Sequence, residues 1–229
     1  VVFSKLTSDL DTPVSIMLKL AGAKKNSFIL ESVTGGETRG RYSIIGMEPD
    51  LIWKCDGERS FLSDGNKAFT EIKGNPLDVF RDLLKKSAIN LPEDLPQASA
   101  GLFGYFGYDM VRHVEDLPNI NPDKLGVPDA IFIRPSLIAV LDGVKGEVIL
   151  VSPVFYDPKT SSDEAFDLAQ NKISNAIFEL KKQIGKNRNL GKSGKIEEPY
   201  SNFTKEEYKA AVEKAKTYIN QGDIFQVVP

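Results

Sequence analysis

Three Asp-Gly pairs lie between short apolar runs, and they restrict the fold more than any other feature of the sequence. They are Asp56-Gly57, Asp64-Gly65 and Asp142-Gly143. Asp-Gly between two strand-like runs is a strong hairpin signal, because tight hairpin turns need residues that tolerate a left-handed backbone. Hairpins join antiparallel strands, which argues against alternating βαβ units. We therefore predict an α+β fold, with antiparallel sheets and peripheral helices.

Capping residues and apolar spacing predict the positions of the helices. Thr12 before Pro13 and Asn75 before Pro76 each indicate a helix start, and Thr204 with Glu207 forms a capping box. Strands are expected at residues 27–32, 41–47, 51–55, 59–62, 68–72, 130–141, 147–154 and 224–228, and helices at residues 12–22, 75–84, 161–184 and 204–222.

The chain is predicted to contain one domain and the beginning of another. Residues 1–185 form the amino-terminal domain, and residues 186–201, rich in glycine and basic residues at their start, form a linker. Residues 202–229 would supply one helix and one strand, which cannot bury a core by themselves. We expect these residues to be the incomplete start of a second domain.

Composition excludes several classes of protein. The net charge of −3 and pI near 5.4 favour neither nucleic acid nor an anionic membrane as a partner. Cys55 is the one cysteine, so an internal disulfide is impossible and a reducing compartment is expected. The sequence shows no signal peptide and no apolar run long enough for a membrane helix. A cytoplasmic location follows as the expectation.

Common catalytic motifs are missing from the sequence. It has no Walker loop, dinucleotide fingerprint or HExxH metal motif. The single histidine, His113, lies among charged residues and is expected at the surface, while Cys55 is expected to be an ordinary strand residue. The glycine-aromatic run at residues 104–108 lacks the spacing of a phosphate loop and is expected to serve packing. Asp109 and Arg112 are expected to form a local ion pair.

Polar residues at the ends of two expected strands suggest a binding site. Glu31 and Ser32 end the first of these strands, and Arg41, Tyr42 and Ser43 begin the next. A carboxylate can hold an ammonium group, while hydroxyls or strand amides can hold a carboxylate. The set therefore suits a zwitterionic amino acid, although a plain salt-bridged hairpin would have the same residues.

Gln226 lies between apolar residues of the last expected strand. A glutamine amide at such a position either faces a polar site or needs buried hydrogen-bond partners.

Four segments in this order resemble the large subunit (component I) family of anthranilate synthase. They are residues 29–32 (Ile-Leu-Glu-Ser), 40–46 (Gly-Arg-Tyr-Ser-Ile-Ile-Gly), 104–112 (Gly-Tyr-Phe-Gly-Tyr-Asp-Met-Val-Arg) and 222–228 (Gly-Asp-Ile-Phe-Gln-Val-Val). Each segment is weak evidence alone, but the ordered set is specific, and the resemblance spans essentially the whole chain. It implies the amino-terminal domain of that family, followed by the first helix and strand of its chorismate-binding domain.

The resemblance also implies an activity. Complete members convert chorismate and ammonia to anthranilate and pyruvate with Mg²⁺, in tryptophan biosynthesis. A small glutamine amidotransferase subunit supplies the ammonia, and tryptophan inhibits by feedback. Glu31 and Ser32, together with Arg41, Tyr42 and Ser43, are then expected to bind tryptophan, and Gln226 to lie at the edge of the active site. The Mg²⁺ ligands would lie beyond position 229, so the chain alone is expected to be inactive.

Gln226 separates this family from some of its relatives. Isochorismate and salicylate synthases have a lysine there that activates water, whereas a glutamine amide cannot act as a base near neutral pH. Aminodeoxychorismate synthase component I shares the glutamine and remains an alternative. A stand-alone amino-acid-binding regulatory module is the other alternative.

Overall fold

The computed structural model describes residues 1–22, 24–31, 40–65, 67–118, 122–184 and 198–228. The chain divides into two compact units, Val1–Ile184 and Gly185–Pro229, which are considered separately. Most of the expected linker at residues 186–201 falls outside the described residues.

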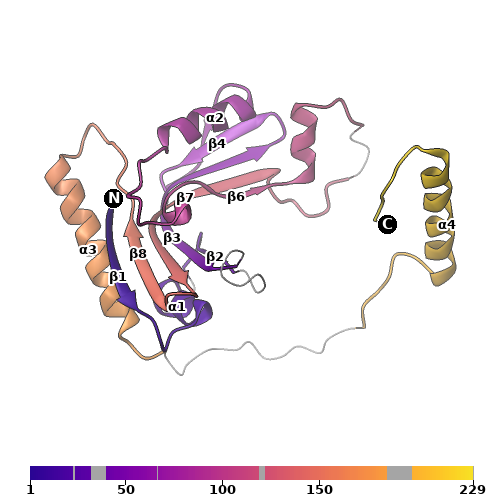
Figure 1. The fold of residues 1–229 in the computed structure, drawn as a ribbon. Coiled ribbons are helices and arrows are strands. Elements are labelled where there is room, and N and C mark those ends of the chain that lie inside the picture. The colour runs from indigo at the N-terminus through magenta and orange to yellow at the C-terminus, as the bar shows by residue number, and fades with distance from the viewer. Residues whose placement is uncertain (23, 32–39, 66, 119–121, 185–197, 229) are drawn as a thin grey trace. The chain divides into compact units, whose positions relative to one another are not determined.

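The first unit is built on one antiparallel sheet with helices packed against it (Figure 1). This arrangement confirms the predicted α+β class. The strands are β1 (Val2–Thr7), β2 (Phe28–Leu30), β3 (Tyr42–Asp56), β4 (Arg59–Ser63), β5 (Thr70–Ile72), β6 (Phe103–Phe106), β7 (Ala130–Asp142) and β8 (Glu147–Ser152). The helices are α1 (Pro13–Leu20), α2 (Pro76–Lys86) and α3 (Ser162–Leu180), with 3₁₀ turns η1 (Gln97–Ser99) and η2 (Tyr108–His113).

Two long strands, β3 and β7, pair along almost their whole lengths and form the centre of the sheet. The outer edge of β3 pairs first with β2 and then with β4. The outer edge of β7 pairs first with β6 and then with β8, and β8 pairs with β1. The outer edge of each central strand is thus shared by two shorter strands, one after the other along its length. Strand β1 was not predicted from the sequence.

A bulge makes β3 one strand where two strands were predicted. Pro49 lies opposite Pro135 and Leu51 lies opposite Arg134, so Asp50 is an extra residue on β3. Such a bulge bends a strand without ending it. The Asp50 carboxylate accepts hydrogen bonds from Arg134 Nε at 2.7 Å and Nη2 at 3.1 Å. The separate strands predicted at residues 41–47 and 51–55 are therefore wrong, because proline and aspartate mark an irregularity within one strand here.

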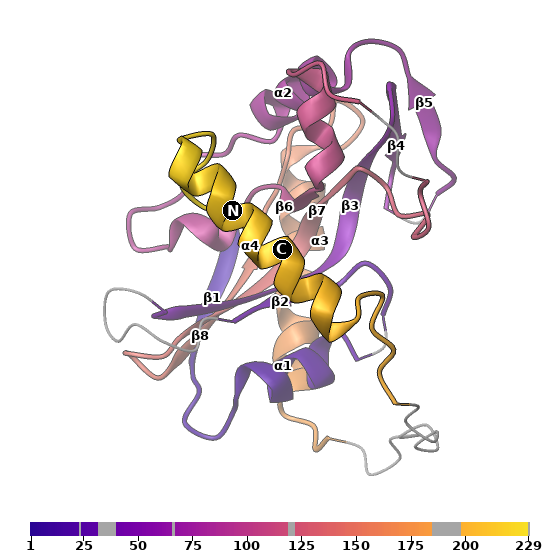
Figure 2. The same cartoon turned by 90° about the vertical axis from the view of Figure 1, so that its right-hand side faces the viewer.

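Residues on β7 alternate between the two faces of the sheet near its carboxyl end. Leu137, Ala139 and Leu141 belong to a core cluster that includes helices α1 and α3. Ile138 and Val140 belong to a different cluster, with Leu91 and Leu95 of the segment before η1. This period-two pattern is what a strand with both faces covered requires. Figure 2 shows α3 behind the sheet in that view.

The remaining half of the sheet packs around Trp53. The Trp53 ring lies 4.8 Å from the Phe80 ring of α2, and both contact Phe132. Gly104 of β6 lies so close to β7 that a Cβ atom would overlap the carbonyl oxygen of Ile131. The expected packing role of the glycine-aromatic run is thus confirmed at Gly104.

The second unit contains helix α4 (Lys205–Gln221). The predicted capping box is present, because Glu207 N donates to Thr204 Oγ1 at 3.2 Å and Thr204 N donates to Glu207 Oε2 at 2.8 Å. Gly222 ends the helix in a left-handed conformation, as predicted.

The strand predicted at residues 224–228 is wrong, since those residues are not in a strand. An extended segment needs a neighbouring strand for its backbone hydrogen bonds. The described part of the second unit offers no such partner.

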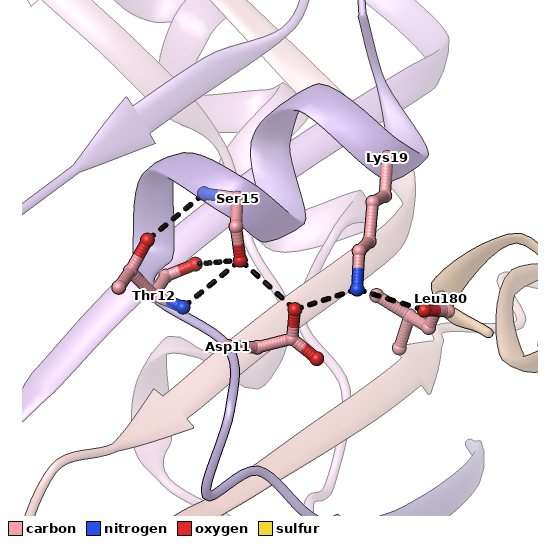
Figure 3. Close-up of polar contacts among 5 residues, drawn as sticks. All are labelled: Asp11, Thr12, Ser15, Lys19 and Leu180. Carbon is pink, nitrogen blue, oxygen red and sulfur yellow. Dashed lines mark hydrogen bonds and ion pairs between the residues drawn. The ribbon is translucent and has the colours of Figure 1, made fainter. Parts of the chain in front are cut away.

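A small polar network joins the ends of α1 and α3 (Figure 3). Lys19 Nζ lies 2.7 Å from Asp11 Oδ1 and donates to the carbonyl oxygen of Leu180 at 2.9 Å. Ser15 Oγ also donates to Asp11 Oδ1, at 2.9 Å. The last carbonyls of a helix lack partners within the helix, so the Lys19 ammonium stabilises the end of α3.

Replacing Lys19 tests this network. The Lys19 and Asp11 side chains are only 15% and 21% exposed. Lys19→Ala therefore leaves the Asp11 carboxylate and the Leu180 carbonyl poorly satisfied, and should lower the free energy of unfolding by about 2 kcal/mol. Lys85→Ala is the control, because that lysine is 79% exposed. Urea unfolding of the two variants should separate them, and equal losses would contradict the role of Lys19.

Candidate functional site

The predicted amino-acid site lies where β2 ends and β3 begins. The two strands are antiparallel neighbours, and Leu30 lies opposite Ile44. Glu31 follows Leu30 directly, and Ser43 precedes Ile44, so the pairing brings these two positions to the same end of the ladder. Glu31 is exposed. Ser32, the other half of the expected pair, lies outside the described residues.

Arg41 fastens the start of β3 to the hairpin between β7 and β8. Its guanidinium donates from Nε to Asp142 Oδ1 at 2.9 Å and from Nη2 to Asp142 Oδ2 at 2.6 Å. Its carbonyl oxygen accepts a hydrogen bond from Gly143 N at 2.9 Å. The forked geometry makes this a strong, directional pair. Asp142 was predicted only as a turn residue, and its register with β3 could not be read from sequence.

Asp142 is a buried carboxylate surrounded by donors. Its side chain is 3% exposed, and Oδ1 also accepts from Val144 N at 3.0 Å and Lys145 N at 3.2 Å. The hydrogen bond from Arg41 lowers the pKa of the Asp142 carboxyl below its ordinary value, and the two backbone donors add to that effect. The carboxylate therefore stays ionised and holds the hairpin turn in place.

Apolar side chains lie beside this polar end of the sheet. Tyr42 and Ile44 are half-buried in the cluster that also contains Phe103. The Phe28 ring stacks on Phe103 with centroids 4.8 Å apart. Leu30 remains 50% exposed. Because side chains alternate along a strand, Leu30, Tyr42 and Ile44 lie on one face of these two strands. Glu31 and Ser43 lie on the other face, which they share with Ile29 and Ile45.

Gln226 belongs to the second unit and is exposed there. It follows α4 and is not part of a strand. Its expected place at the edge of an active site stays a prediction, because the structure does not relate the two units to one another.

A family model described as chorismate binding enzyme matches residues 25–229. The chain belongs to this family. Over 233 aligned residues it is 53% identical to anthranilate synthase component 1 of Cereibacter sphaeroides, covering 100% of this chain and 47% of that protein. It is 39% identical to the protein of the same name from Pseudomonas putida, covering 97% of this chain and 45% of that one. The chain therefore spans about half the length of these curated relatives.

A solved structure of anthranilate synthase component I from Streptococcus pneumoniae TIGR4 resembles the fold. The TM-score is 0.60 at 22% identity, and the match covers 95% of this chain and 45% of that one. At that identity the likeness supports the fold alone. It agrees with the α+β arrangement described above.

The side chain of His113 is buried, so its predicted surface position is wrong. Its side chain is only 4% exposed, and Nε2 lies 3.7 Å from Cys55 Sγ. The 3₁₀ turn η2 folds back on the end of β3, which the run of charged neighbours in the sequence concealed. Asp109 and Arg112 form the expected ion pair, with Oδ1 and Nε 2.9 Å apart.

Cys55 is a buried strand residue, as predicted. Burial, followed by the charge of the nearby Asp129, raises the pKa of the Cys55 thiol to about 11. The thiol is thus protonated near neutral pH, which does not suit a nucleophile.

Among the described residues, no group of three or more His, Cys, Asp or Glu side chains could hold a metal ion. None of the described helices is long and apolar enough to cross a membrane.

The Arg41–Asp142 pair predicts a pH-dependent loss of stability. Asp142→Asn should cost about 2–3 kcal/mol at pH 7, because it removes the charge that Arg41 and the turn amides hold. Since the folded-state pKa of Asp142 is lowered, its contribution is present above the unfolded value near 4 and is lost as pH falls through the folded value. Urea unfolding at pH 7 and at about pH 3 measures the difference from the native sequence.

Asp116→Asn serves as the matched control, because Asp116 is exposed. It should cost little at either pH. The assignment fails if Asp142→Asn costs no more than the control at pH 7, or costs the same at both pH values.

Proposed function

We propose that this chain is part of the large subunit of an anthranilate synthase. The observation that carries the proposal is the 53% identity, over the whole chain, to a protein named anthranilate synthase component 1. On this proposal the complete protein converts chorismate and ammonia to anthranilate and pyruvate, a lyase reaction of tryptophan biosynthesis. A glutamine amidotransferase subunit supplies the ammonia, and the complex is cytoplasmic.

The end of β2 and the start of β3 would hold tryptophan as a feedback inhibitor. Glu31 would bind the ammonium group, while Ser32, Ser43 and the strand amides would bind the carboxylate. Ile29 lies on the same face of the two strands as Glu31 and Ser43, and its half-buried side chain offers apolar surface for the indole ring. Arg41 would act mainly by fixing the start of β3, since its guanidinium is bound to Asp142.

The catalytic centre would be completed by residues outside this chain. Gln226 would contribute its amide at the edge of that centre, where it can donate and accept hydrogen bonds but cannot take up a proton. Mg²⁺ would be held by carboxylates of the complete protein that are not among the residues described here. The 229-residue chain assayed alone should therefore give no anthranilate.

An inhibition assay of the complete protein tests the proposal. Chorismate, ammonium and Mg²⁺ should yield fluorescent anthranilate, and added tryptophan should suppress it. Glu31→Ala should raise the half-inhibiting tryptophan concentration at least tenfold, because it removes the charge expected to hold the ammonium group.

The exposed Glu71 on β5 provides the control, and Glu71→Ala should leave both turnover and inhibition unchanged. Formation of aminodeoxychorismate would contradict the proposed reaction, and a protein that binds tryptophan without consuming chorismate would indicate a regulatory module. Inhibition unchanged by Glu31→Ala would contradict the proposed tryptophan site.

A further inference from the structure

A cavity lies at the opposite end of β8 from the Arg41–Asp142 pair. It has a volume of about 450 Å³ and is lined by Ser152, the segment at residues 153–157 and the first turns of α3. Glu147 and Ser152 mark the two ends of β8, which a six-residue strand places about 17 Å apart. The volume falls within the range of small-molecule sites. This cavity is therefore separate from the proposed tryptophan site.

Lys172 of α3 contributes a positive charge to the cavity. The side chain is half-buried, and its Nζ donates to Ser136 Oγ at 2.6 Å. Ser136 is itself fixed, since its hydroxyl donates to the carbonyl oxygen of Glu48 at 2.6 Å. An ammonium has three donors, and this serine is a neutral partner. Among the described residues, no carboxylate forms an ion pair with Lys172.

The acidic residues that line the cavity are engaged elsewhere. Asp50 forms the forked pair with Arg134, whose guanidinium lies 4.0 Å from the centre of the Phe155 ring. Asp157 accepts hydrogen bonds from Lys159 N at 3.0 Å and from Thr160 Oγ1 at 3.2 Å. Neither of these two carboxylates forms an ion pair with Lys172, and a partly buried cation gains stability from a direct ionic partner.

Apolar side chains make up much of the rest of the wall, together with the hydroxyls of Ser152, Thr160, Ser161 and Ser162. Pro153, Val154, Ala165, Leu168 and Ala169 line it, and the Leu168 side chain is 54% exposed. Small-molecule sites commonly combine an apolar lining with a few fixed polar groups that orient the ligand. A purely inorganic anion would leave this apolar surface unused.

We propose that this cavity binds a small organic carboxylate. The carboxylate lies against the Lys172 ammonium beside Ser136, and the apolar body of the molecule lies against Leu168 and Val154. The proposal does not depend on the anthranilate synthase assignment, because it concerns binding at a place distinct from the β2–β3 site.

Titration of the 229-residue chain with sodium benzoate tests the proposal, with benzamide as the neutral analogue and sodium chloride as the salt control. The backbone amide NMR signals of Ser136, Val154 and Ala169 should shift and saturate. Benzoate should bind at least tenfold more tightly than benzamide, because only benzoate forms a charge-assisted pair with Lys172. Lys172→Gln should weaken benzoate binding at least tenfold, whereas Lys181→Gln, an exposed lysine just beyond α3, should not.

A second variant provides a test that does not rely on removing Lys172. Leu168→Glu places a carboxylate four residues before Lys172 on the same helix, a favourable arrangement for an ion pair. It should abolish benzoate binding without loss of helix content, while Leu168→Gln should retain binding within about threefold. Non-saturating shifts, equal binding of benzoate and benzamide, or unchanged binding in Lys172→Gln or Leu168→Glu would overturn the proposal.

Discussion

The pairing of β3 with β7 is the constraint on which the rest of the first unit depends. It joins residues 42–55 to residues 130–142, and the chain between them supplies β4 beside β3 and β6 beside β7. Strands β2 and β4 follow one edge, and β6 and β8 follow the other (Figure 1). Bringing distant parts of the sequence together costs chain entropy before the contacts between them can form. The apolar side chains of both strands offset that cost when they are buried.

Two forked ion pairs fix the register of this central ladder. Arg41–Asp142 closes the end that lies beside the proposed tryptophan site, and Arg134–Asp50 holds the bulge. A one-residue slip would exchange the two faces of each strand and separate both pairs. The two pairs therefore specify one alignment of β3 with β7, and this alignment sets where Ser43 and Ser136 lie along the sheet.

Local signals in the sequence predicted much of the fold. The caps at Thr12, Asn75 and Thr204 are all present, because capping depends only on neighbouring residues. Contacts between distant residues could not be predicted, so β1, the partner of Arg41 and the burial of His113 were missed. The bulge at Asp50 resembled a break between strands. Residues 224–228 have the composition of a strand, but a strand also needs a partner.

The proximity of two segments of the candidate site was predicted. Sequence placed Glu31 and residues 41–43 near each other, and the antiparallel pairing of β2 with β3 brings those segments together. It gave no sign that Arg41 is bound to Asp142, since that contact follows from the β3–β7 register. No motif in the sequence marks Lys172, and only the folded arrangement of α3 and β7 brings it to Ser136.

Native-state hydrogen exchange measured residue by residue tests the central role of the β3–β7 ladder most directly. The slowest backbone amides should lie in the paired parts of β3 and β7, and their exchange should report the global free energy of unfolding. Amides of α4, none of whose residues is buried, should exchange much faster. Slowest exchange in another part of the chain, or protection of α4 equal to that of β3 and β7, would contradict this account.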